Sequence, residues 1–160
     1  MNWVKLHLVT NHFPIILIVA GSLAAIAAAL SHRVGIWRYA FVTVLLAGLT
    51  APVSYISGMQ AEEAVEHEWY VVHDQVEKHE ETGLWALIAL VAAGIMAAVT
   101  WWRPTPTLRW VFLVVAIVAA VVTAYAALEG GEIVHDSPFL ERSPGATQRV
   151  PPPVPASPSG

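Results

Sequence analysis

The apolar positions of this chain fall into four long runs that contain no Asp, Glu, Lys or Arg. They cover residues 13–30, 39–58, 84–102 and 110–128. A helix rises about 1.5 Å per residue, so about 20 residues cross the ~30 Å hydrocarbon core of a bilayer. Buried strands are shorter, about 4–8 residues, and lipid leaves backbone polar groups no partners outside their own helix. The pattern predicts an all-α, integral membrane four-helix bundle with up-down-up-down topology.

The polar segments between and after these runs define the rest of the organisation. We expect residues 1–136 to form the transmembrane domain. Residues 137–160 are rich in proline, end in VPPPVPASPSG and should form an extended or disordered tail. The acidic segment 59–82 has opposite charges at i,i+4 spacing, which predicts helical extensions of the second and third spans or a helix on the membrane surface. The first apolar run is too long for a signal-peptide core, so we expect it to be retained.

Local residues predict where the helices begin and end. Asn11 is placed to cap the first helix, with Pro14 in its first turn, where no backbone donor is needed. Gly58 closes the second apolar run, and Gly83 precedes the third. The pair Gly130-Gly131 is expected to end the fourth helix.

The 160 residues include no cysteine, which narrows the chemistry available to the chain. Thiolate-bound zinc, iron–sulfur clusters, disulfides and covalently attached haem are excluded within this chain. Any cofactor must bind through histidine, carboxylate, methionine or carbonyl groups. No basic nucleic-acid footprint is visible, so we expect the lipid bilayer to be the main partner.

Charged residues and histidines are segregated by the predicted topology. All 12 Asp and Glu residues and six of the seven His fall on one side of the membrane, whereas the two tight turns on the other side hold four Arg, one His and no acid. Each side carries four Lys and Arg, but two on the acidic side lie in the distal tail. The positive-inside rule then places the turns in the cytoplasm of a bacterial inner membrane. Both termini would lie on the outer, periplasmic side.

Several of these histidines should converge at the outer face. His12 precedes the first apolar run and His79 precedes the third, so the two can lie at matching depth on facing helices. Haem b needs such an axial pair. We predict His12 and His79 as the haem b ligands of an electron-transfer subunit. His7 and His135 form a second pair or donate hydrogen bonds to the site.

Two other functions remain open at this stage. A divalent-metal site, for zinc or iron, would use His7, His12, His79 and Glu132. Alternatively, the chain is a non-catalytic accessory or scaffold subunit of a membrane complex, in which the histidines are incidental. No constellation of residues identifies a substrate, so an electron-transfer or accessory subunit is expected rather than a stand-alone enzyme.

Three short sequence pieces resemble a bacterial membrane family known as domain of unknown function 2231. They are HLVTNHFP at residues 7–14, the mid-chain His79, and GGEIV at residues 130–134. The residue after the first histidine is Leu8, where the family usually has proline. The resemblance covers residues 5–136 and implies four spans. Relatives of this type occur joined to Rieske or cytochrome c modules, which implies a redox partner of that kind.

Overall fold

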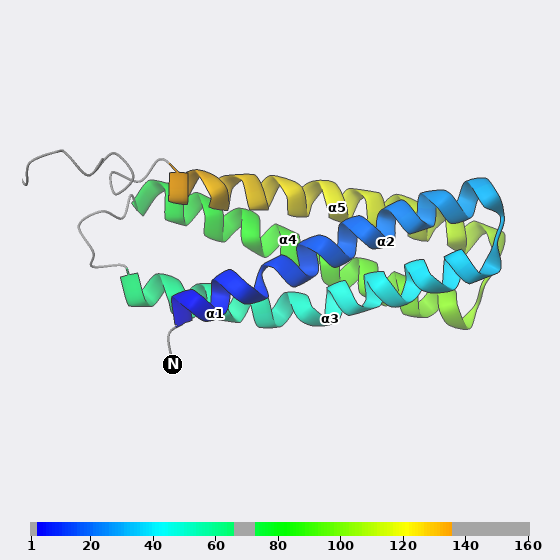
Figure 1. Ribbon diagram of the computed structural model, residues 1–160, viewed down its shortest axis with the longest axis horizontal. Helices are drawn as coiled ribbons and strands as arrows, with labels where there is room; N and C mark the ends of the chain where they lie inside the picture. Colours follow the sequence, from blue (N-terminus) through cyan, green and yellow to red (C-terminus); the bar gives the residue numbers. More distant parts are fainter. Residues whose placement is uncertain (1–2, 66–72, 136–160) are drawn as a thin grey trace, which may run out of the picture.

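The protein, described by a computed structural model over residues 3–65 and 73–135, is built from helices, with no strand in these ranges. Figure 1 shows them side by side along one long axis. In chain order they are α1 (Trp3–Thr10), α2 (His12–Ser31), α3 (Val34–Val65), α4 (His73–Trp102) and α5 (Pro106–His135). Because α1 and α2 follow one another along one corner, the architecture is an up-down-up-down four-helix bundle, as predicted.

Four helical stretches are long and apolar enough to cross a bilayer: Trp3–Ser31, Val34–Glu63, Glu77–Trp102 and Pro106–Gly131. Large apolar side chains point outward along all of them, such as Leu30, which is 79% exposed. In water such a surface would be costly, whereas in lipid it is matched by its surroundings. The chain is therefore a multi-pass membrane protein.

The two ends of the bundle differ in how the chain passes between helices. At one end, here called the turn end, two short turns join α2 to α3 and α4 to α5 (Figure 1). His32 adopts a left-handed conformation (φ 56°) and donates its N–H to the Ala28 carbonyl, 2.9 Å away. The Thr105 hydroxyl accepts the Leu108 N–H at 3.2 Å, and Pro106 opens α5. The opposite end, here called the open end, carries Trp3, Val65, His73 and His135.

The predicted start of the first long helix is confirmed in position, because α2 begins at His12 directly after Asn11. Two details differ. A further helix, α1, precedes it from Trp3, and Asn11 has right-handed helical angles without a side-chain capping bond. The Asn11 N–H donates to the His7 carbonyl at 2.9 Å, as in a continuing helix. Pro14 has no N–H for the Thr10 carbonyl, which accounts for the break between α1 and α2.

Gly83 and Gly130, which were expected at helix ends, lie inside helices, and so does Gly58, which closes the second apolar run. α3 runs through Gly58 to Val65, α4 begins at His73 before Gly83, and α5 runs through Gly130 to His135. The acidic segment thus forms helical extensions at 59–65 and 73–82. In these residues the first of the two predictions, extension of the second and third spans, is confirmed. Residues 66–72 and the tail 137–160 lie outside the described residues.

The turn half of the core is filled by aromatic side chains. Trp37, Phe41 and Phe112 are buried, and the Phe41 and Phe112 rings meet edge to face with centroids 4.8 Å apart. Trp101 joins Phe41 at 6.5 Å. The Arg109 guanidinium lies over the Trp37 ring at 5.8 Å and covers the end of this cluster.

Glycine sets the spacing of α3 and α4 at mid-bundle. A Cβ on Gly48 would lie 3.0 Å from the Gly94 Cα, so the two backbones touch with no side chain between them. Beyond this contact, towards the open end, the core residues become small or polar. Buried examples are Ala51, Ser54, Ser57, Ala86, Thr123 and Ala126.

Candidate functional site

His7 enters the open half of the bundle from α1 and is held by α3. Its Nδ1 lies 3.1 Å from the Ser54 carbonyl oxygen and 3.3 Å from the Ser57 hydroxyl. A carbonyl only accepts hydrogen bonds, so Nδ1 carries the proton when the ring is neutral and bonded in this way. The lone pair of the neutral ring then resides on Nε2, which is free for a ligand.

A small hydroxyl network fixes this arrangement. Ser57 donates to the Ser54 carbonyl at 2.8 Å, and its hydroxyl lies 3.0 Å from that of Thr10. Thr10 also bonds the Leu6 carbonyl at 2.9 Å. The hydroxyls therefore have partners within the bundle, and together they tie α1 to α3 beside the His7 ring.

His79 enters the same half of the bundle from α4. Its ring packs against Gly130 of α5. Its Nδ1 is buried and finds no hydrogen-bond partner among the described residues. Buried polar atoms nearly always have a partner, so this nitrogen marks a place where a bound group or water is expected.

Each imidazole packs against a glycine of a neighbouring helix. A Cβ built on Gly58 would lie 2.9 Å from Cε1 of His7, and a Cβ built on Gly130 would lie 2.8 Å from Cε1 of His79. Both distances are shorter than side-chain contacts allow. The glycines thus let the rings approach the α3 and α5 backbones, which explains why they stand inside helices at a cost of about 1 kcal/mol each relative to alanine.

The two histidines approach each other from opposite corners. Both α2 and α4 pack between α3 and α5, so the α1–α2 corner and α4 are diagonal to one another. The structure therefore places the rings of His7 and His79, two residues 72 positions apart in the sequence, in the same half of the bundle on diagonal helices.

An ion pair adjoins this site on the surface between α4 and α5. Lys78 Nζ lies 2.8 Å from Glu129 Oε1, with side chains 55% and 11% exposed respectively. These residues directly precede His79 and Gly130 in the sequence. The pair thus bridges α4 and α5 beside the point where the His79 ring packs over the glycine.

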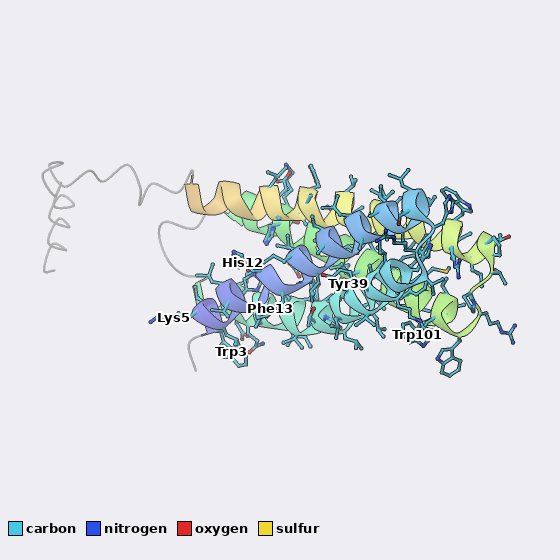
Figure 2. The ribbon with its side chains drawn as sticks, turned by 45° about the vertical axis from the view of Figure 1, so that its right-hand side comes forward. Trp3, Lys5, His12, Phe13, Tyr39 and Trp101 are labelled. Carbon is cyan, nitrogen blue, oxygen red and sulfur yellow. The ribbon has the colours of Figure 1, made fainter. Side chains whose placement is uncertain are left out.

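The other predicted ligands are placed differently. His12 is exposed, and its Nδ1 lies 2.7 Å from the Leu8 carbonyl, one turn earlier in α1. Figure 2 shows it near the open end with Lys5, whereas Trp101 lies near the turn end. Glu132 and His135 belong to the last turn of α5, and their side chains lie outside the described residues. Among the residues described, no three His, Asp or Glu side chains are grouped to hold a metal ion.

From the sequence, His7 was expected in a second pair with His135 or as a hydrogen-bond donor, because the first helix was predicted to begin near residue 13. The signal was nevertheless present in the spacing of small and apolar residues. Pro14, Gly21 and Ala28 are buried at seven-residue intervals, and His7 continues this series backwards by one step. A helix with that period keeps these positions on one core-facing seam.

Fold and site together define a four-span helical membrane protein with a diagonal pair of imidazoles near one end of its core. No family model, curated protein or solved structure matches the chain. The resemblance to the domain of unknown function 2231 therefore stays a prediction, supported by the sequence pieces quoted above.

Proposed function

We propose that this chain is a membrane electron-transfer subunit that binds haem b between His7 and His79. The observation that carries the proposal is the placement of two half-buried imidazoles on diagonal helices in the open half of the bundle, each packed against a glycine of a neighbouring helix. Haem iron takes two axial ligands, and a pair of histidines on facing helices meets that requirement. A closed zinc site needs about four ligands, more than this pair offers.

The state of the rings also supports haem ligation. Iron-binding imidazoles usually donate one ring N–H to a carbonyl and bind the metal with the other nitrogen. His7 makes such a bond to the Ser54 carbonyl, so its Nε2 is the ligand we propose. The Nδ1 of His79 is buried and has no hydrogen-bond partner among the described residues, and a bound group could provide that partner.

Bound haem would supply reversible one-electron transfer, and the protein would set its conditions. His7 and His79 hold the iron, while Gly58 and Gly130 allow the rings their positions beside the helix backbones. Negative charge of the exposed carboxylates at the open end would favour the oxidised, more positive state and lower the reduction potential, whereas the Glu129 carboxylate is paired with Lys78.

The surroundings of the site suggest its location and partner. Exposed carboxylates of Glu63, Glu77, Glu80 and Glu81 surround the open end. Such a rim attracts a basic soluble protein by long-range electrostatics. We propose that the open end faces the periplasm of a bacterial inner membrane and exchanges electrons with a redox module of the Rieske or cytochrome c type.

Optical spectroscopy of the purified protein tests this function. After expression with ample haem supply, we expect a Soret band and, on addition of dithionite, the sharp visible bands of low-spin reduced haem. His7→Ala and His79→Ala should each abolish these bands. His12→Ala serves as the matched control and should retain them, because the His12 ring is bonded to the Leu8 carbonyl on the exposed surface.

Each alternative function has its own outcome in this experiment. Absence of pigment in the unmodified protein would contradict haem binding, and zinc or iron in elemental analysis would then favour a metal site. Absence of both would favour an accessory or scaffold subunit. Loss of pigment in His12→Ala, with pigment retained in His7→Ala, would contradict the role of His7 and indicate that His12 binds the haem iron.

A further inference from the structure

The turn end carries a strong positive charge that no carboxylate balances. Residues 32–38 and 103–109 hold Arg33, Arg38, Arg103 and Arg109 but no Asp or Glu. The first three are exposed. Among the described residues, none of the four forms an ion pair with an acid. The three exposed guanidinium groups are therefore available for an anionic partner that comes from outside the chain.

Two of these arginines flank the same helix–helix seam. The contact between the Phe41 and Trp101 rings joins α3 to α4 near the turn end. Arg38 lies three residues before Phe41 on α3, and Arg103 follows Trp101 by two residues on α4. Both arginines therefore border the α3–α4 seam where it reaches the turn end. Arg109 is engaged otherwise, because its guanidinium is stacked on Trp37.

Aromatic residues indicate that this seam ends at the lipid headgroups. Tyr39, Trp101 and Trp102 are all exposed, Trp102 to 85%. Such side chains gather at membrane–water interfaces, with their apolar bodies towards the acyl chains. The neighbouring arginines then lie at the depth of the lipid phosphates. Guanidinium groups bind phosphate through paired hydrogen bonds, which lysine cannot reproduce.

We propose that the turn end binds an anionic phospholipid, with its headgroup phosphate between Arg38 and Arg103 and its acyl chains along the α3–α4 surface. Arg33 adds a third positive charge nearby. The occupant is a lipid rather than a soluble anion because the exposed aromatics beside the arginines provide an apolar surface for its chains. This proposal is independent of haem binding, since it concerns the opposite end of the bundle.

Titration of phosphatidylglycerol into the purified full-length protein in neutral detergent, followed by native mass spectrometry, tests the proposal. Each basic side chain near an anionic surface contributes about 1 kcal/mol, so the double variant Arg38→Gln/Arg103→Gln should bind about thirtyfold more weakly. The matched control is Arg142→Gln/Arg149→Gln, which removes the same charge from the C-terminal segment and should bind as the unmodified protein does.

Three further comparisons make the result specific. Arg38→Lys/Arg103→Lys should recover only part of the affinity, because charge returns without the paired hydrogen bonds. Phosphatidylcholine should bind more weakly than phosphatidylglycerol, and sodium phosphate should not displace the lipid. The proposal is overturned if the tail variant loses as much affinity as the seam variant, if both lipids bind equally, or if free phosphate competes.

Discussion

The two halves of the bundle use the same helices but fill their cores in opposite ways. In the turn half, rings of Trp37, Phe41 and Phe112 interlock, and Phe112 is fully buried. In the open half, the buried positions beyond Leu90 hold mostly alanine, serine and threonine, and the two imidazoles pack against glycine. The aromatic half supplies cohesion through dispersion contacts. The polar half contributes less to stability and carries the groups capable of chemistry.

This contrast agrees with a general division of labour in proteins. Buried polar groups in lipid-facing helices are costly, and they persist where a function needs them. A rigid, well-packed half positions the helices, so that the other half can hold strained or unsatisfied groups such as His79 Nδ1. Substitutions in the two halves should therefore fail in different ways.

The largest effect on stability is expected at the centre of the aromatic half. Phe112→Ala removes a ring that contacts both Trp37 and Phe41. Truncation of a buried aromatic side chain costs about 3–5 kcal/mol. In a mixed-detergent titration, we expect the variant to unfold at a correspondingly lower mole fraction of the denaturing detergent. A loss below 1 kcal/mol would show that this cluster is not the main source of cohesion.

An intermediate effect is expected where the imidazoles meet glycine. Gly130→Ala places a Cβ 2.8 Å from the His79 ring, so the ring or the helix must shift. Overpacking of this kind costs about 1–3 kcal/mol and should displace the ligand we propose. The measurements are the unfolding midpoint and the haem content of the purified protein.

Gly131→Ala is the matched control for that substitution. A Cβ on Gly131 meets nothing within 4 Å, and Gly131 also lies inside α5. Alanine is the better helix former by about 1 kcal/mol, so this variant should be as stable as the unmodified protein or more so. Equal damage from both variants would mean that the contact of Gly130 with His79 has no special role.

The smallest effect is expected at the Lys78–Glu129 pair. The Lys78 side chain is 55% exposed, and ion pairs of this kind contribute at most about 1 kcal/mol. Lys78→Gln should therefore leave the unfolding midpoint almost unchanged. Because the pair adjoins His79, any effect should show in the haem spectrum rather than in stability. A large destabilisation would contradict the view that packing, not surface charge, sets the α4–α5 register.

The class of fold could be predicted from the sequence, because lipid imposes a simple requirement of length and apolarity on each span. The helix ends were harder to predict. Glycine is typical of helix ends, but only the three-dimensional contacts show that Gly58 and Gly130 accommodate the rings of His7 and His79. Helix propensity describes the backbone of the residue itself and contains no information about side chains that approach it from another helix.

The candidate site was predicted in part for a similar reason. His79 and the convergence of histidines at one end follow from the topology, since helix ends on one side of a membrane are neighbours. The choice between His7 and His12 depends on which side of a helix faces the core. Those two residues are five apart and therefore about 140° apart around the axis, so only one of them can face the core. With the helix predicted to begin near residue 13, His12 rather than His7 was expected at the site.

The backbone contact between Gly48 and Gly94 has a mechanical consequence. For the haem binding that we propose, a flat macrocycle would have to enter between the imidazoles, and the helices would have to separate at the open end. Contact at mid-bundle, with no side chains to compress, holds α3 and α4 at their crossing point. The open end would then widen through a change in the tilt of α3 and α4 about this contact. Bulkier residues at positions 48 or 94 would push the two helices apart and change the crossing angle between them.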